Sequence, residues 1–199
     1  MEPSPATYPV TFTHEPPETL ERWRPLVSWL LVIPHLLVLY VVQLVAGVCS
    51  FIAWFVILFT GKLPEGLAGP IALSIRYQMR ATTYAYFLHG EYPPFSFDTT
   101  TADPGDDPRV RVEVVPQLED RDRITVFFRW LTVIPSAFVL ALIGIAASFA
   151  ILIAGFAVIF TGRWPDGLRS FVMGYFRWTA RLLGYGMLLT DEYPPFSMD

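Results

Sequence analysis

Arginine residues spaced four positions apart are the part of this sequence best suited to binding chemistry. Two such pairs occur, and one more arginine lies two helical turns before the second pair: Arg76, Arg80, Arg169, Arg177 and Arg181. A spacing of four places two side chains on one face of a helix. A guanidinium group presents a planar fork of N–H donors that suits carboxylate and phosphate about equally. We therefore expect these arginines to bind lipid headgroups or carboxylates.

The residues around the arginines leave three kinds of partner open. The segments 67–88 and 168–189 are otherwise largely apolar or aromatic, as at Ile75, Met79 and Phe176. A narrow basic stripe on an apolar helix is typical of a helix that lies in the headgroup layer and binds lipid phosphate. A partner protein is the second possibility. Acidic residues of the same chain are the third, and those nearest in sequence are Glu65, Glu91, Asp166, Asp191 and Glu192.

No catalytic residues, metal ligands or cofactor motif can be recognised in the sequence. It contains no Ser/His/Asp spacing typical of a hydrolase and no glycine-rich phosphate-binding loop. The single cysteine, Cys49, cannot form an internal disulfide. A net charge of −4 argues against nucleic-acid binding. We expect a protein that is not an enzyme and carries neither a metal nor another cofactor.

Two long segments without charged residues dominate the composition. No Asp, Glu, Lys or Arg occurs in residues 25–61 or 130–162. Uncharged apolar stretches of about 18 or more residues are typical of membrane-embedded helices. A helix of 33 residues would be about 50 Å long, against a hydrocarbon core of about 30 Å. Each block is therefore either a helical hairpin or one long span kinked at Pro34 or Pro135.

The distribution of basic residues favours the hairpin. All 14 Lys and Arg residues lie outside the two blocks. A hairpin places both flanks of each block on the cytoplasmic side, as the positive-inside tendency requires, and keeps the two halves parallel. It needs a turn within lipid, where unpaired backbone groups are unfavourable. We expect a multi-pass protein of the cell membrane with cytoplasmic polar segments.

The chain is a tandem duplication. The segment EYPPFSFD ends at residue 98 and returns as EYPPFSMD at residue 199, and FTGKLPEGL (59–67) returns as FTGRWPDGL (160–168). The offset is 101 residues throughout and needs no gap, which indicates an internal repeat. We predict a first membrane repeat at 1–98, an acidic linker at 99–108 and a second membrane repeat at 109–199.

Each repeat is predicted to contain the same elements. A short strand, at 8–13 or 110–115, precedes the apolar block; the two strands either pair with each other or lie on a membrane-proximal surface. A turn rich in Gly and Pro then leads into the arginine-bearing helix, and an extended YPPF tail follows. We assign structural roles to Pro34, Pro135, Gly61, Pro64, Gly162, Pro165, Tyr92, Pro93, Pro94, Phe95, Tyr193, Pro194, Pro195 and Phe196.

These motifs together resemble a bacterial membrane family known as domain of unknown function 4389, present here as two tandem copies. The resemblance rests on the Trp-x4-Pro-His run from Trp29 to His35, the FTGxxPxGL turn, the RxxxR helix and the EYPPFS tail. Gly90 replaces the usual acid in the first copy, and Ser136 replaces the usual His in the second. The resemblance implies a membrane protein and no particular reaction.

The sequence thus predicts a mostly α-helical integral membrane protein of two parallel repeats. Each repeat would hold a hydrophobic helical hairpin, or one long kinked span, and an amphipathic interfacial helix. The function that fits best is a non-enzymatic accessory, scaffold or lipid-interacting subunit of a membrane assembly. Its partners would be membrane lipids, anionic ones among them, and a membrane protein or a second copy of the chain. The alternative is a small transporter or channel-like protein, which needs polar groups facing a lumen.

Overall fold

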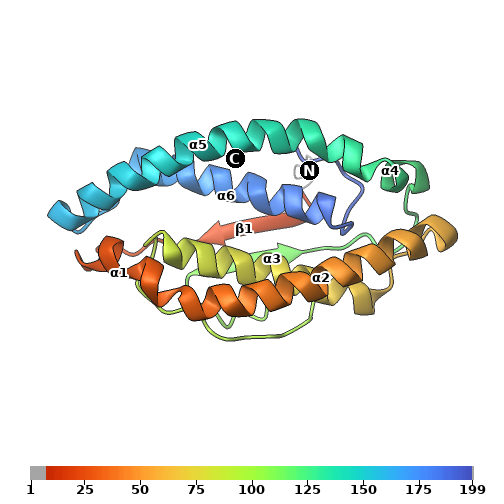
Figure 1. The fold of residues 1–199 in the computed structure, drawn as a ribbon, viewed down its shortest axis with the longest axis horizontal. Coiled ribbons are helices and arrows are strands. Elements are labelled where there is room, and N and C mark those ends of the chain that lie inside the picture. The colour runs from red at the N-terminus through yellow and green to blue at the C-terminus, as the bar shows by residue number, and fades with distance from the viewer. Residues whose placement is uncertain (1–7, 199) are drawn as a thin grey trace, which may run out of the picture.

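Six helices and two strands make up residues 8–198, the part of the chain that the computed structural model describes. Each repeat contributes a strand, a short helix, a long apolar helix and a shorter helix (Figure 1). In chain order the elements are β1 (Val10–His14), α1 (Arg24–Leu31), α2 (Ile33–Thr60), α3 (Glu65–Ala85), β2 (Val110–Val114), α4 (Arg123–Phe127), α5 (Arg129–Thr161) and α6 (Asp166–Gly186).

The second apolar block forms one helix, α5, and the first forms α1 and α2, which are separated only at Val32. Neither block turns back on itself, so the predicted hairpin within the block is wrong. α2 has 28 residues and α5 has 33. No strong turn signal interrupts either block, and continuing the helix keeps every backbone hydrogen bond that a turn would break. Pro34 lies in the first turn of α2, where a proline is tolerated, and Pro135 lies inside α5.

A helical hairpin does form, but between the apolar helix and the arginine-bearing helix that follows it. Gly61 and Gly162 end α2 and α5 in the left-handed conformation, with φ of 72° and 71°, which glycine adopts without strain. Pro64 and Pro165 are extended and precede the first residues of α3 and α6. These turns fold α3 back along α2 and α6 back along α5 (Figure 1).

The two repeats are antiparallel, and the parallel arrangement that we expected is wrong. α2 runs from α1 towards α4, whereas α5 runs from α4 back towards α1 (Figure 1). Near the end of α2, Trp54 Nε1 donates to the Val126 carbonyl at 3.1 Å, just before α5 begins. At the other end, Pro25 of α1 lies beside Gly155 of α5. Antiparallel pairing of two equivalent strands relates the repeats by an approximate two-fold axis.

The strands pair with each other, which was one of the two predicted alternatives. β1 and β2 are antiparallel, with Phe12 opposite Val112 at the centre of the register. Alternate side chains of both strands are buried and join one hydrophobic core with the long helices. That core includes Val10, Phe12, Val110, Val112, Val114, Ala53, Ile57, Ala147, Ala150, Ala154 and Val158. Both repeats therefore share a single core.

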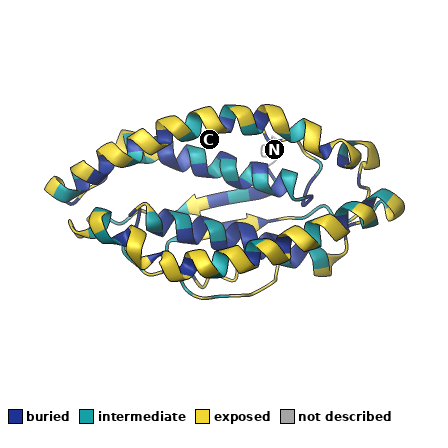
Figure 2. Ribbon diagram, in the orientation of Figure 1, coloured by how far each residue is buried: buried dark blue, intermediate teal, exposed yellow. Residues whose placement is uncertain are grey.

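The outer sides of α2 and α5 are exposed and apolar along their whole length (Figure 2). The exposed side chains include Leu37, Tyr40, Val41, Leu44, Phe51, Phe55 and Phe59 of α2 and Trp130, Leu131, Phe138, Leu142, Phe149, Phe156 and Phe160 of α5. Monomeric soluble proteins rarely expose a contiguous apolar patch of this extent. By length and composition, both helices are candidates for crossing a membrane.

Gly184 of α6 allows β1 to pack directly on this helix. A Cβ at Gly184 would lie 2.5 Å from Val10 Cγ2. We predict that Gly184→Ala pushes the strand from the helix and lowers the free energy of unfolding by about 1–3 kcal/mol, measured by denaturant unfolding in a mild nonionic detergent. At Gly66 of α3 a Cβ would meet no described atom within 4 Å. Gly66→Ala is the control and should leave stability unchanged or slightly higher; equal losses in both variants would contradict this packing.

Candidate functional site

Arg76 and Arg80 are buried and bind the acidic linker of their own chain. Arg76 Nη2 donates to two linker carbonyl oxygens at 2.9 and 3.0 Å. Both guanidinium groups lie beside Asp103: Arg76 Nε is 3.7 Å from Oδ2, and Arg80 Nη2 is 3.0 Å from Oδ1. Arg80 also pairs with Asp106 at 2.7 Å. The stripe that could have bound lipid phosphate is thus covered by residues 98–106.

The acids that engage this pair are linker residues and not the acids that we weighed from the sequence. Glu91 pairs instead with Arg109, whose Nη2 lies 2.7 Å from Glu91 Oε1. The hydrogen bond from Arg109 lowers the pKa of Glu91 below its usual value. Burial lowers the pKa of Arg76, and the neighbouring charge of Asp103 works in the opposite direction. The linker is therefore a structural strap across α3.

In the second repeat, the C-terminal tail occupies the place that the linker occupies in the first. Arg177 Nη1 and Arg181 Nη1 donate to backbone oxygens of residues 197–198 at 3.5 and 3.4 Å. Both arginines are partly exposed. Arg169 lies apart from them and forms an exposed ion pair with Asp166 at 2.6 Å. The structure therefore does not bring the five predicted arginines together in one site.

The two YPPF tails, at 92–95 and 193–196, run along their own repeats in an extended form. In the first repeat the ring of Phe95 stacks on His35, with ring centres 4.1 Å apart. In the second, the Ser136 hydroxyl donates to Tyr193 Oη at 2.6 Å. The tails thereby cover two buried polar side chains, His35 of α2 and Ser136 of α5.

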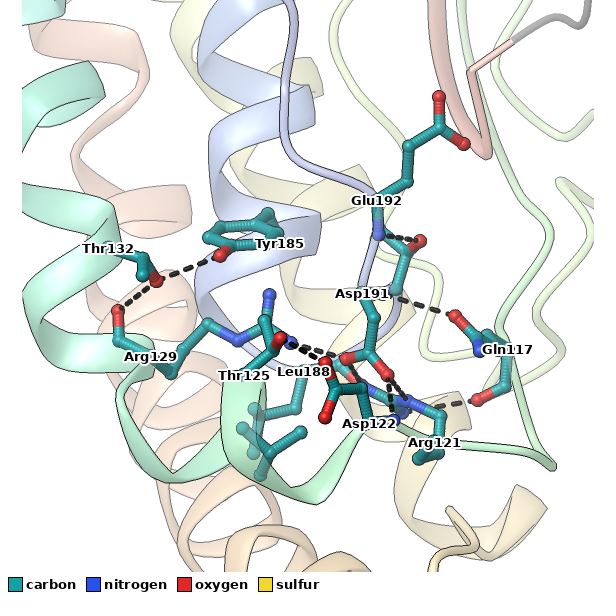
Figure 3. A network of polar contacts seen from close by, with 12 residues as sticks. Gln117, Arg121, Asp122, Thr125, Arg129, Thr132, Tyr185, Leu188, Asp191 and Glu192 are labelled. Carbon is teal, nitrogen blue, oxygen red and sulfur yellow. Dashed lines mark hydrogen bonds and ion pairs between the residues drawn. The ribbon is translucent and has the colours of Figure 1, made fainter.

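A second charged cluster, which we did not identify from the sequence, joins the start of α5 to the segment after α6 (Figure 3). Arg121 Nε and Nη2 donate to the two carboxylate oxygens of Asp191 at 2.9 and 2.8 Å. Arg129 Nη2 donates to the same carboxylate from the opposite side, and the Asp122 backbone N–H donates to it at 2.9 Å. Burial by itself would raise the pKa of Asp191, but the hydrogen bonds and charge of Arg121 outweigh it and hold the pKa low.

Arg129 keeps two donors without a partner among the described residues. Its Nε and Nη1 make no hydrogen bond, although the side chain is only 3% exposed. The guanidinium carbon lies 3.8 Å from the centre of the Tyr185 ring (Figure 3). A buried donor without an acceptor costs free energy, and an aromatic face offsets part of that cost. Arg129 is thus the least satisfied charged group in the cluster.

The cluster is present in only one of the two repeats. The residues 101 positions before its Arg, Arg and Asp members are Leu20, Ser28 and Gly90. Comparison of the two copies could have identified it, because three residues change together from apolar or small to charged. The contact between Arg121 and Asp191 cannot be recognised from neighbouring positions in the sequence, because the two residues lie 70 residues apart.

A cavity of about 610 Å³ lies between α2 and α5 beside this cluster. Its walls are mostly apolar and include Phe51 and Trp54 of α2 and Trp130 of α5, with Arg129 at one side. In residues 8–198, no group of three or more His, Cys, Asp or Glu side chains could hold a metal ion. The site is therefore an apolar space with one charged wall.

One protein-family comparison matches most of the chain. The sequence model described as "Domain of unknown function (DUF4389)" matches residues 22–96 and 123–198. Each match begins near α1 or α4 and ends one or two residues after the YPPF tail. Neither the curated proteins nor the solved structures contain a match to the chain.

Asp191 is predicted to be essential for stability, because its removal leaves two buried guanidinium groups without a carboxylate. Asp191→Asn should lower the free energy of unfolding by about 3–5 kcal/mol, measured by denaturant unfolding in detergent. Asp166→Asn removes the exposed partner of Arg169 and should cost less than about 1 kcal/mol.

The contribution of Asp191 to stability should also depend on pH. The folded-state pKa of Asp191 is lowered, so this contribution is complete above the unfolded pKa of about 3.9 and is lost as the pH falls below that value. A gap between Asp191→Asn and wild type that persists unchanged at pH 2 would contradict this.

Asp103 is predicted to hold the linker in place. Its side chain is fully buried between Arg76 and Arg80, so Asp103→Asn should release residues 98–106 from α3 and speed their proteolysis at least tenfold. Glu119→Gln, which breaks the exposed Lys62–Glu119 pair, is the control. A cleavage rate that is the same in the two variants would show that the linker is held by other contacts.

Proposed function

The chain belongs to the family described as domain of unknown function 4389 and contains that domain twice; we propose, from the distribution of its surface, that it is a non-enzymatic, lipid-interacting accessory protein of the cell membrane. In this proposal, α1, α2, α4 and α5 insert their apolar sides into one leaflet. The sheet and the linker face water on the cytoplasmic side and offer the surface for a membrane-protein partner.

The observation that carries the proposal is the separation of apolar and polar surface between elements. The exposed large apolar side chains lie on α1, α2, α4 and α5 and in the loops and tails, whereas α3 and α6 contribute none among the described residues. The exposed strand residues Arg111 and Glu113 are charged. A helix with one long apolar side and a polar body behind it is typical of proteins that lie in the membrane interface.

Polar groups beside the middle of the long helices argue against a spanning orientation. Thr99 of the linker shares a groove with Val41 and Val45, close to the midpoint of α2. Arg111 and Glu113 belong to β2, and the strand pair lies about midway along the body (Figure 1). If α2 lay along the bilayer normal, these groups would sit in hydrocarbon, where each charge costs several kcal/mol. An orientation in the membrane plane keeps them in water.

The in-plane orientation replaces the multi-pass topology predicted from the sequence. It keeps the predicted placement of all basic residues on the cytoplasmic side. Arg123 lies beside Gly61, where α2 ends, and Arg22 lies beside Gly162, where α5 ends. Basic residues thus lie at both ends of the body, and a spanning orientation would divide them between the two sides. In the membrane plane, all of them reach the headgroups of one leaflet, as the positive-inside tendency favours.

The transporter alternative has less support. A conduction path needs polar groups that face a common lumen. The buried polar groups of the long helices bind their own repeat instead: His35 Nδ1 lies 2.7 Å from Tyr77 Oη, and Ser136 binds Tyr193. Ion flux through liposomes that contain the purified protein would favour the transporter.

We predict that the two ends of α2 lie on the same side of the membrane. Cys49 is first replaced by Ala, and single cysteines are then introduced at Arg22 and at Lys62. Each variant is treated with a membrane-impermeant maleimide in sealed inside-out and right-side-out vesicles from expressing cells. In the in-plane orientation, both positions react in the inside-out vesicles only, because both face the cytoplasm. A spanning α2 would give opposite patterns at the two positions.

Two further cysteines serve as controls for depth. Glu113→Cys, on the exposed strand side, should react without detergent in inside-out vesicles. Leu44→Cys, on the exposed apolar side of α2, should react only after detergent is added. Recovery of the wild-type protein in the soluble fraction after lysis without detergent would refute the membrane location altogether.

A further inference from the structure

The cavity between α2 and α5 has the size and lining of a site for an acyl chain. Its volume of about 610 Å³ falls within the range of small-ligand pockets, about 300–1,000 Å³. Phe51 and Trp130, at its walls, are 62% and 77% exposed. The cavity therefore opens on the apolar surface that faces lipid, and a chain can enter without crossing water.

Arg129 supplies a positive charge at the inner wall. The charged groups packed around it are Arg121, Asp191 and Asp122. Asp191 is shared with Arg121, and the Asp122 carboxylate accepts from the first turn of α4. Two guanidinium groups thus share one partly buried carboxylate, and Nε and Nη1 of Arg129 have no acceptor. Arg129 lines the cavity. Protein atoms cover Nε and Nη1 in the present rotamer, so a rotation of the side chain would be needed to present these donors to an anion at the cavity wall.

The first repeat has no arginine at the position of Arg129. Its Arg24 lies over Tyr84, the counterpart of Tyr185, but pairs with Glu21 at 2.7 Å. Ser28 stands 101 positions before Arg129, and Gly155 stands 101 positions after Trp54. A Cβ at Gly155 would meet the ring of Phe87 at 3.4 Å. The ring of Phe87 therefore fills the space beside Gly155 that corresponds to the cavity of the second repeat. The approximate two-fold axis would have given two equal sites. The difference between the repeats therefore marks the cavity at Arg129 as a feature of the second copy alone.

We propose that this cavity binds one acyl chain of an anionic lipid, whose charged headgroup pairs with the free donors of Arg129. The inference rests on the proposed membrane location and adds the class of ligand. An apolar lining by itself would accept any chain. The guanidinium selects a carboxylate or phosphate over a neutral headgroup, because a charge-assisted hydrogen bond in a dry site is stronger than a neutral one.

Oleate is the probe for the test, and its brominated analogue 9,10-dibromostearate is the reporter. Trp54 and Trp130 line the cavity, so a bound brominated chain quenches their fluorescence. The full-length protein is titrated in phosphatidylcholine nanodiscs at pH 8.5, where the headgroup carboxylate is ionised. Oleate should displace the reporter, and its uncharged methyl ester should do so at least tenfold more weakly. Equal displacement by the two compounds would overturn the role of the charge.

Two variants separate the charge from the space. Arg129→Gln should weaken binding at least tenfold. The substitution should leave the fold intact, because Asp191 keeps its ion pair with Arg121. Gly47 also lines the cavity, and a Cβ there would meet no described atom within 4 Å. Gly47→Leu therefore fills the cavity without a clash and should abolish quenching. Gly167→Leu, a glycine with equal space outside the cavity, is the matched control and should bind as wild type does. Wild-type binding by Gly47→Leu would overturn the proposal.

A phospholipid arm distinguishes a free fatty acid from a membrane lipid. Nanodiscs that contain brominated phosphatidylglycerol should quench wild type more than Arg129→Gln if the headgroup phosphate binds. Quenching by dibromostearate alone would assign the site to a single-chain carboxylate. Either result supports an anionic acyl ligand, and equal quenching of wild type and Arg129→Gln by both probes overturns it.

Failure of this proposal can be told from failure of the membrane location. Flotation of each variant with phosphatidylcholine vesicles reports the apolar surface, which Arg129→Gln and Gly47→Leu leave intact. Proteins that float but show no selective quenching refute the ligand site alone. Proteins that do not float refute the membrane location on which it rests.

Discussion

Two long helices that can bury only one side in the protein impose the constraint on which the rest of this structure depends. α2 and α5 pack small side chains such as Ala53 and Ala154 into the shared core, and their opposite sides carry Leu, Ile, Val and Phe in the open. Water is a poor solvent for so much apolar area, at about 25 cal/mol per Å². In the proposed membrane location, lipid acyl chains cover this area, and the placement of every charged group has to be compatible with them.

The arginines meet this requirement through carboxylates and carbonyls of the same chain. Arg76 and Arg80 lie under the linker, and Arg121 and Arg129 share Asp191. Buried guanidinium groups remain charged, so each needs a counter-ion or a row of carbonyl oxygens close by. The linker thus does more than join two domains, since it completes the first repeat, as the C-terminal tail does the second.

Duplication gave the molecule two equivalent halves, and antiparallel pairing of β1 with β2 placed them about an approximate two-fold axis. The halves then differ at a few positions with large consequences. Ser28 stands where the second repeat has Arg129, and Gly90 where it has Asp191. The shared Asp191 carboxylate therefore belongs to the second repeat, whereas in the first Arg24 pairs with Glu21 beside Gly90. The second copy thus holds an incompletely paired arginine beside an open cavity.

The sequence by itself determined the features that depend on neighbours along the chain. These are the repeat, the apolar helices, the glycine and proline turns that end them, and the extended YPPF tails. It did not determine whether each block would turn back in its middle, because a hairpin and a continuous helix have the same composition. Only the tertiary structure decided that the repeats run antiparallel, that Asp103 meets Arg76, and that Arg129 faces Asp191 beside a cavity. Those contacts join residues tens of positions apart, and their free energy comes from packing that local propensity does not encode.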